Sequence, residues 1–149
     1  PLEHTYTPGR GLGLGYRRPA GWMDASADSA LPAVPVRLLR TDFAAWLTIG
    51  EVRVAGGVED IRELARAALA LDTAGAAFRI FSPVEGVEAG GKRAAAYETV
   101  GTSSPDTVRT VLFEMQGRFY EVRALAGAGR AGREEVFSTQ QRLVETLAW

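Results

Sequence analysis

The apolar residues change their spacing near the middle of the chain, and this change constrains the fold more than any other feature. In AWLTIGEVRVA, residues 45–55, alternate residues share one face, as they do in a strand. After two glycines, VEDIRELARAALALD, residues 58–72, has apolar residues at helical spacing, with Glu59 and Asp60 in its first turn. A strand followed directly by an amphipathic helix predicts a sheet with a helix packed against it.

The second half of the chain predicts further strands and a closing helix. Residues 107–126 alternate apolar and polar side chains on either side of a tight turn at Gln116-Gly117. Residues 78–81 predict a short strand, which is followed by a hairpin turn at Gly90-Gly91. The last segment, residues 133–149, has the spacing of a helix.

The first 35 residues are rich in proline and glycine and predict extended segments joined by turns. Residues 11–15, GLGLG, predict a glycine-rich strand that ends in a turn at Pro19. We expect Trp22, just after this turn, to be buried against the sheet. Residues 24–35 read as a polar loop, and VRLLR, residues 36–40, reads as a strand.

The order of these elements indicates the class of fold. Strands, a helix, more strands and a final helix predict an α+β fold in which helices flank an antiparallel sheet. The length suits one domain over residues 1–149, with residues 1–10 as an extended N-terminal segment.

The composition excludes several classes of function. There are no cysteines, so disulfides, thiol nucleophiles and thiolate metal sites are excluded. The formal net charge is -1 and no basic stripe is present, which argues against nucleic-acid binding. No stretch approaches the roughly 20 apolar residues of a membrane span, so we expect at most a peripheral association with a membrane.

Two glycine-rich segments resemble nucleotide-binding loops, but neither has the required context. A dinucleotide-binding loop needs a helix directly after its glycines, and Pro19 and Gly21 argue against a helix after residues 11–15. Residues 86–92 have the glycine and lysine spacing of a P-loop, but Arg93 stands where Ser or Thr would hold Mg²⁺. We therefore predict a strand and a hairpin turn here, and no nucleotide cofactor.

No set of residues predicts catalysis or metal binding. His4 is the single histidine, and one histidine alone is a poor catalytic base or metal site. The acidic pairs Glu85/Glu88 and Glu134/Glu135 fit a solvated surface, the second pair at the beginning of a helix. We expect a protein that is not an enzyme and that has no metal or cofactor.

The N-terminal region is the remaining candidate for a functional surface. His4, Tyr6, Arg10, Arg17 and Arg18 give it a mildly basic and aromatic character that suits a protein–protein contact. The alternative interpretation is an ordinary solvated edge strand that carries arginines. The residues alone favour neither interpretation.

The order of motifs along the chain resembles that of the PsbP-like family. YTPGRGLGLGYRRPAGW resembles the family's opening strand and P-x-G-W turn, VRLLRTDFAAWLTIGEVRV the next strand pair, and GGVEDIRELARAAL the first helix. GGKRAAAYETV resembles a Gly-Lys turn before a tyrosine-bearing strand, and VLFEMQGRFYEVRALAG resembles the hairpin with a Gly-(Lys/Arg)-x-Tyr corner. The chain departs from the family in having one tyrosine in AAAYE, no histidine in DTVRTVLF and no Ser-Phe at its close.

The resemblance implies an α-β-α sandwich and a non-enzymatic accessory role. For a PsbP member this role is that of an extrinsic subunit of photosystem II in the thylakoid lumen of the chloroplast, supporting the oxygen-evolving or assembly machinery. The implied partners are the photosystem core and other extrinsic subunits. The alternative is a bacterial envelope protein or chaperone of the same fold, in the periplasm or cell envelope. Because of the departures, no metal site is carried over.

Overall fold

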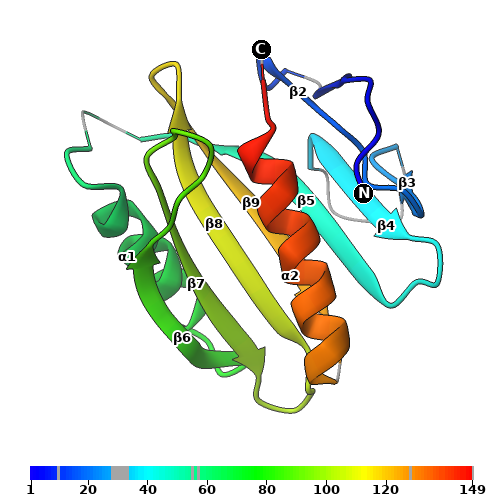
Figure 1. Ribbon diagram of the computed structural model, residues 1–149. Helices are drawn as coiled ribbons and strands as arrows, with labels where there is room; N and C mark the ends of the chain where they lie inside the picture. The colour runs from blue at the N-terminus through cyan, green and yellow to red at the C-terminus, as the bar shows by residue number, and fades with distance from the viewer. Residues whose placement is uncertain (10, 28–33, 55, 57, 128, 149) are drawn as a thin grey trace.

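Nine strands and two helices make up the part of the chain that the computed structural model describes, residues 1–9, 11–27, 34–54, 56, 58–127 and 129–148 (Figure 1). Two strands form a separate N-terminal hairpin, and seven form one antiparallel sheet. The hairpin consists of β1 (Thr7–Gly9) and β2 (Leu14–Tyr16). In spatial order the sheet consists of β3 (Trp22–Asp24), β4 (Val36–Arg40), β5 (Ala45–Val52), β9 (Arg118–Ala126), β8 (Thr107–Met115), β7 (Ala94–Gly101) and β6 (Phe78–Gly86).

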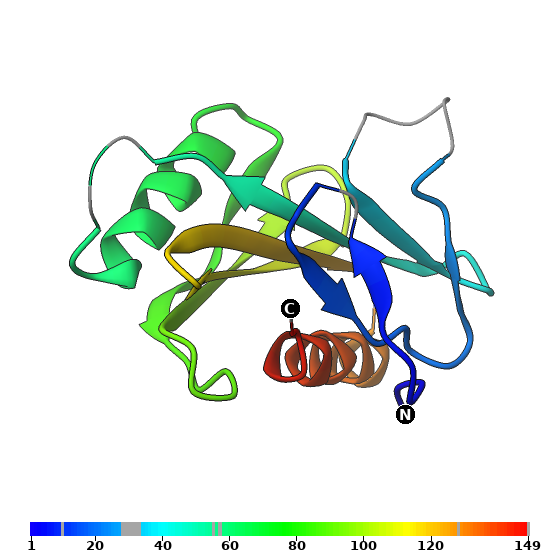
Figure 2. The same cartoon turned by 90° about the horizontal axis from the view of Figure 1, so that it is seen from above.

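The two helices cover opposite faces of this sheet and different halves of it. Helix α1 (Ile61–Asp72) packs on β6, β7 and β8, whereas α2 (Arg130–Glu145) packs on β9. Figure 2 shows the sheet between the two helices, with the N-terminal hairpin on the side of α2. The α+β class, with an antiparallel sheet flanked by helices, is confirmed.

Helix α1 lies where the helical spacing predicts it, but its beginning differs by a few residues. Asp60 is the N-cap, because its side chain accepts a hydrogen bond of 2.9 Å from the Arg62 amide. The prediction that Glu59 and Asp60 lie in the first turn was therefore wrong, and the acidic residue of that turn is Glu63.

Helix α2 begins and ends earlier than the sequence predicts. It runs from Arg130 to Glu145, so the described part beyond Glu145 is not helical, and Glu134 and Glu135 do not lie in the first turn. That expectation was wrong because the helix begins at Arg130, directly after Gly129, whose positive φ of 109° is one that residues with a Cβ rarely adopt. The turn at Gln116-Gly117 is confirmed, with φ values of 55° and 75° that match a two-residue hairpin turn.

The glycine-rich segment is a hairpin turn and not the strand that its alternation predicts. Gly11 and Gly13 have φ values of 68° and 69°, which side chains with a Cβ rarely adopt, and they lie between β1 and β2. Only Gly15 lies in a strand. Its main chain pairs with Pro8 on one side and exchanges two hydrogen bonds with Ala148 on the other, which ties the end of the chain to β2.

Each helix closes its own apolar core. The larger core lies between the sheet, α2 and the N-terminal hairpin, and it includes the predicted anchor Trp22, which is 7% exposed. The smaller core lies under α1 and includes Ile61, Ala65 and Leu112. The side chain of Tyr120 joins the larger core to the hairpin, since its hydroxyl donates to the Leu12 carbonyl at 2.5 Å.

Candidate functional site

Of the N-terminal residues predicted to bind a partner, Tyr6 lies against the end of α2. Its side chain is half exposed, and its hydroxyl donates a hydrogen bond of 2.9 Å to the carbonyl of Thr146. His4 is exposed in the same segment. Arg10 lies outside the described residues.

The two predicted arginines hold the N-terminal segment to the chain that follows β2. Arg17 Nε donates to the Glu3 carbonyl at 2.6 Å, and Arg18 Nη2 pairs with the Glu3 carboxylate at 2.8 Å. The hydrogen bond and Coulomb attraction from Glu3 raise the pKa of Arg18. The structure therefore gives both arginines a contact inside the chain, and their role towards a partner stays a prediction.

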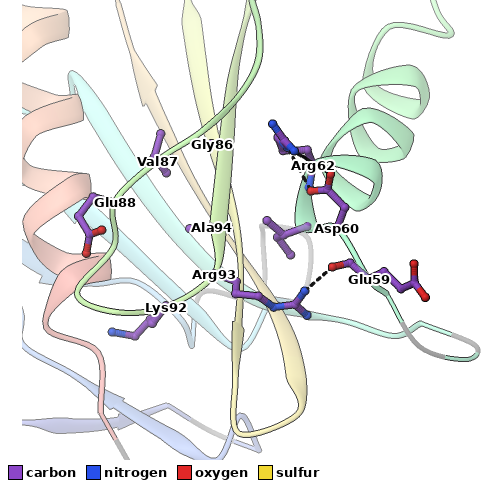
Figure 3. A pocket seen from close by; sticks show the side chains of 10 residues that line it. Glu59, Asp60, Arg62, Gly86, Val87, Glu88, Lys92, Arg93 and Ala94 are labelled. Atoms are coloured by element: carbon purple, nitrogen blue, oxygen red, sulfur yellow. Dashed lines mark hydrogen bonds and ion pairs between the residues drawn. The ribbon is translucent and has the colours of Figure 1, made fainter.

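The loop with P-loop spacing joins β6 to β7 and separates its two basic side chains. Figure 3 shows Lys92 and Arg93 on opposite sides of the loop, with Arg93 reaching towards the segment before α1. Arg93 donates to the carbonyls of Val58 and Glu59 and pairs with the Glu114 carboxylate. A hollow of about 390 Å³ lies beside these contacts.

Lys92 faces the other helix. Its Nζ lies 3.4 Å from the carbonyl of Glu145 at the end of α2, and burial lowers its pKa. Because Lys92 and Arg93 bind main-chain oxygens of different segments, the loop connects α2 and the segment before α1 to the β6–β7 hairpin, and the two side chains do not converge on an anion. The prediction of a hairpin turn at Gly90-Gly91 is confirmed, with φ values of 62° and 81°.

The helices leave one quarter of the sheet open on the side of α1. In β4, β5 and β9, the apolar side chains that face α2 are buried, as in Leu38, Leu47 and Val122. The alternate side chains of the same strands face the side of α1 and are only partly buried. Helix α1 packs mainly on β6, β7 and β8 on that side, and it reaches β5 and β9 through Val52 and Phe119, which pack against its core, and through the contact of Asp72 with Arg123.

One apolar row crosses this open quarter at an end of the sheet. The cross-strand register places Met23 beside Leu39, Leu39 beside Trp46, and Trp46 beside Leu125. All four side chains are partly exposed. We call them the end row: Met23, Leu39, Trp46 and Leu125. The next row on the same face is polar, with Arg37, Thr48 and Arg123 in register.

An exposed aromatic residue lies in the turn between β4 and β5, the strands that carry Leu39 and Trp46. Phe43 is 71% exposed and has a φ of 61°, a conformation that costs a residue with a Cβ about 1–2 kcal/mol. The Asp42 carboxylate fixes this turn, because it accepts hydrogen bonds from the Ala44 amide at 2.9 Å and from Arg40 Nε at 2.8 Å. Those hydrogen bonds lower the pKa of Asp42. We call the end row together with Phe43 the end patch.

A network of charged side chains fixes the polar row beside the end patch. Asp72, the last residue of α1, accepts hydrogen bonds from Arg123 at 2.9 and 3.1 Å and from the Tyr97 hydroxyl at 2.5 Å. Burial alone would lower the pKa of Arg123, but the contacts with Asp72 and Glu121 raise it. The network joins the end of α1 to β7 and β9, and so holds the surface beside the end patch in one arrangement.

The end patch was not predicted from the sequence, although the sequence contains part of the pattern that indicates it. The alternation in residues 45–55 places Trp46 on the face of β5 opposite to Leu47, but it does not say which face remains open. Phe43 stands between Asp42 and Ala44 in a turn, so no periodicity marks it. In the described part of the chain, no three His, Cys, Asp or Glu side chains gather as metal ligands. No described helix combines the length and apolar character needed to cross a membrane.

Comparison with known proteins identifies the fold. No family model and no curated protein sequence matches the chain. Among solved structures, the Ran-binding protein Mog1p of Saccharomyces cerevisiae matches with a TM-score of 0.72 and 10% identity, over 99% of this chain and 95% of that chain. Cyanobacterial PsbP (CyanoP) of Synechocystis sp. PCC 6803 matches with a TM-score of 0.65 and 12% identity, over 97% and 92% of the two chains.

A third similar structure comes from an envelope protein. LpqN of Mycobacterium tuberculosis, which is involved in cell envelope biogenesis, matches with a TM-score of 0.63 and 15% identity, over 97% of this chain and 88% of that chain. The three proteins differ in setting but share the arrangement of one antiparallel sheet and its helices. This chain therefore has the PsbP/Mog1 fold, as its resemblance to the PsbP-like family implies.

Proposed function

We propose that this protein is a non-enzymatic binding domain that docks on a partner protein through the end patch. The observation that carries the proposal is the exposed Phe43 in the turn that joins β4 to β5, two of the strands that carry the partly exposed row of four apolar side chains. Aromatic residues and methionine are enriched in the cores of protein interfaces, and polar residues form their rims. The end patch has such a centre, and Arg37 and Thr48 lie along its side as a rim.

The conformation of Phe43 supports a role in recognition. An exposed aromatic ring gains little in the free protein, and its φ of 61° costs free energy. The turn around Asp42 holds the backbone in this conformation before any partner arrives, which reduces the entropy lost on binding. A preorganised aromatic side chain at the edge of an apolar row is the kind of anchor that dominates binding energy.

The charged residues of the sheet support a binding role over a catalytic one. Arg118 forms two hydrogen bonds of 2.8 and 2.9 Å with the Glu51 carboxylate, and Arg123 forms two with Asp72. These pairs join β5 to β9 and α1 to β9. They act as ties between elements, and each carboxylate already has a bidentate partner.

The first setting that we propose is the lumenal face of a photosystem, most directly photosystem II, with the photosystem core and other extrinsic subunits as partners. The similarity in fold to CyanoP and the order of sequence motifs support this setting. If it is correct, antibodies against the chain detect it in thylakoid membranes of the source organism, and a salt wash releases it. Absence from both the membranes and the wash contradicts this setting.

The second setting is a bacterial cell envelope, where the chain would be an envelope protein or a chaperone. The similarity in fold to LpqN supports it. Fractionation of the source cells distinguishes the two settings, because this one predicts the chain in envelope fractions that lack photosystem subunits. Either setting leaves the proposed mode of binding through the end patch unchanged.

Site-specific photocrosslinking tests the proposed surface. A photoreactive phenylalanine analogue replaces Phe43 in cells of the source organism, and Ala67, exposed on α1, is the control position. We expect position 43 to give one discrete crosslinked protein, which mass spectrometry then identifies. Crosslinks that are equal at both positions, or found only at position 67, contradict docking through the end patch.

A further inference from the structure

A second open quarter of the sheet lies on the opposite face, beside α2. Figure 1 shows α2 running over β9, with β6 and β7 uncovered on that side of the sheet. Here a hollow of about 470 Å³ lies between the sheet and α2. It is lined by Phe81, Glu98, Arg109, Arg133, Glu134 and Phe137. We call it the Arg109 pocket.

Two adjacent glutamines of α2 hold the Arg109 guanidinium in this pocket. Its Nη1 donates to Gln140 Oε1 at 3.1 Å, and its Nη2 donates to Gln141 Oε1 at 3.0 Å. The amide nitrogen of Gln140 donates to two strand carbonyls at 2.8 Å, and that of Gln141 donates to the Glu88 carbonyl at 2.5 Å. Since both amide nitrogens are engaged elsewhere, both amide oxygens stay turned towards Arg109.

Arg109 is a partly buried cation whose direct partners are neutral. Among the described residues, no carboxylate oxygen lies within the 4.0 Å of an ion pair with its guanidinium. Burial lowers its pKa, and Glu98 and Glu85 oppose this only by Coulomb attraction. A guanidinium has five N–H donors, and Gln140 and Gln141 accept from only two of its nitrogens. Donors remain for a charged acceptor.

Two aromatic side chains, Phe81 and Phe137, line the pocket together with Arg109. Phe81 on β6 is 47% exposed, and the Arg133 guanidinium lies 5.0 Å from the centre of its ring. Phe137 on α2 packs against the larger core and also lines the pocket. A ligand between these rings would bury apolar surface while its polar end meets Arg109.

We propose that the Arg109 pocket binds a small monocarboxylate that carries an aromatic or branched aliphatic group. The carboxylate pairs with the free N–H groups of Arg109, and the apolar group lies between Phe81 and Phe137. Arginine suits this ligand because its planar fork matches a carboxylate in two parallel hydrogen bonds. The volume of the hollow, about 470 Å³, falls in the range of sites for small molecules. This inference does not depend on docking through the end patch.

Glu98 acts as a competitor for Arg109 in this proposal. The two residues face each other in register on β7 and β8, and Glu98 also lines the pocket. An external carboxylate has to approach against the charge of Glu98. Replacing Glu98 with glutamine removes that charge and keeps the shape of the side chain.

The test measures binding of 4-phenylbutyrate to the intact protein by chemical-shift changes at the amides of residues 108–111, with 4-phenylbutanamide as the neutral probe of the same shape. We expect 4-phenylbutanamide to bind at least about tenfold more weakly than 4-phenylbutyrate, because it cannot form the charge-assisted pair. Arg109→Gln should give the same loss for the acid, and Glu98→Gln should tighten its binding.

Equal binding of the acid and the amide to the unmodified protein overturns the proposal, and this comparison needs no variant to fold. Shift changes that lie outside the pocket, or that persist unchanged in Arg109→Gln, also overturn it. Arg109→Lys keeps the charge without the fork and is expected to bind between the wild type and Arg109→Gln. Affinity for Arg109→Lys equal to that of the wild type contradicts the role of the planar fork.

Discussion

Gln140 and Arg109 bind each other across the contact between α2 and the sheet. The Gln140 side chain is fully buried, its amide nitrogen donates to the Arg109 carbonyl at 2.8 Å, and its oxygen accepts from the Arg109 guanidinium at 3.1 Å. The same nitrogen donates to the Val122 carbonyl of β9. One side chain of α2 thus fixes the helix to two strands.

Leucine fills about the same space as Gln140 but has no N–H group. Replacing Gln140 with leucine therefore leaves the buried carbonyl acceptors without their donor. We expect the free energy of unfolding to fall by about 1–3 kcal/mol, the usual cost of a buried polar group that loses its partner. Urea unfolding followed by circular dichroism measures the change. Ser138→Ala, on the exposed side of the same helix, is the control and should change stability by less than about 0.5 kcal/mol. Equal losses in both variants would show that the Gln140 contacts are not stabilising.

Trp22 and Trp46 are predicted to differ in their contributions to stability. Trp22 is 7% exposed in the larger core, so Trp22→Ala should lower the free energy of unfolding by about 3–5 kcal/mol. Trp46 is partly exposed in the end row, and Trp46→Ala should cost about 1–2 kcal/mol because less apolar surface is lost. Denaturant midpoints of the two variants provide the comparison. A larger loss for Trp46 than for Trp22 contradicts the assignment of Trp46 to an open face.

The sequence predicted the elements of this fold better than their arrangement. The helix over residues 58–72 and the hairpin around Gln116-Gly117 depend on local spacing and turn chemistry, which a single sequence contains. The pairing of β5 with β9 joins Ala45 to Ala126, and no local pattern specifies it. Both open quarters of the sheet depend on that long-range order.

The same limit applies to the candidate sites. The N-terminal surface was predicted from residue types alone. In the structure, Arg17 and Arg18 both form hydrogen bonds with Glu3 of the same chain. Phe43 and Arg109 become visible only when burial and hydrogen-bond partners are known. Arg109 is one of many arginines in the sequence, and it lies in a segment whose residues alternate between apolar and polar.

Gly90 and Gly91 have similar backbone conformations but different surroundings. A Cβ on Gly90 would lie 2.4 Å from the Glu145 carbonyl oxygen, whereas a Cβ on Gly91 would have nothing within 4 Å. Both alanine variants carry the cost of a positive φ, and Gly90→Ala also has to displace the end of α2. We therefore expect Gly90→Ala to cost about 1–3 kcal/mol more than Gly91→Ala in thermal or urea unfolding. Equal costs would mean that the loop does not pack against α2.

Buried tyrosines predict a loss of stability at alkaline pH. Burial, followed by the charge of Asp24, raises the pKa of Tyr16 to about 12, and burial also raises the pKa of Tyr97 and Tyr120. A tyrosine is neutral when protonated, so the folded state keeps a proton that the unfolded state releases near pH 10. This stabilisation is complete below about pH 10 and is lost as the pH rises towards about 12.

Urea midpoints at about pH 9 and about pH 11 measure this loss. Lys92 is the only lysine, and the arginines stay charged in this range, so the tyrosines account for most of the change. Tyr16→Phe should show a smaller decrease between the two values than the wild type. A stability that is constant up to about pH 11 would contradict the burial of these phenols.

The most direct test of docking through the end patch combines affinity and stability in one variant, Phe43→Asn. Asparagine tolerates a positive φ better than phenylalanine, so the variant should unfold at the same or a higher urea concentration than the wild type. Its affinity for the partner identified by crosslinking at position 43 should be at least about 30-fold lower, as for a loss of about 2 kcal/mol at a central anchor. Full affinity in a stable Phe43→Asn protein would contradict the central claim.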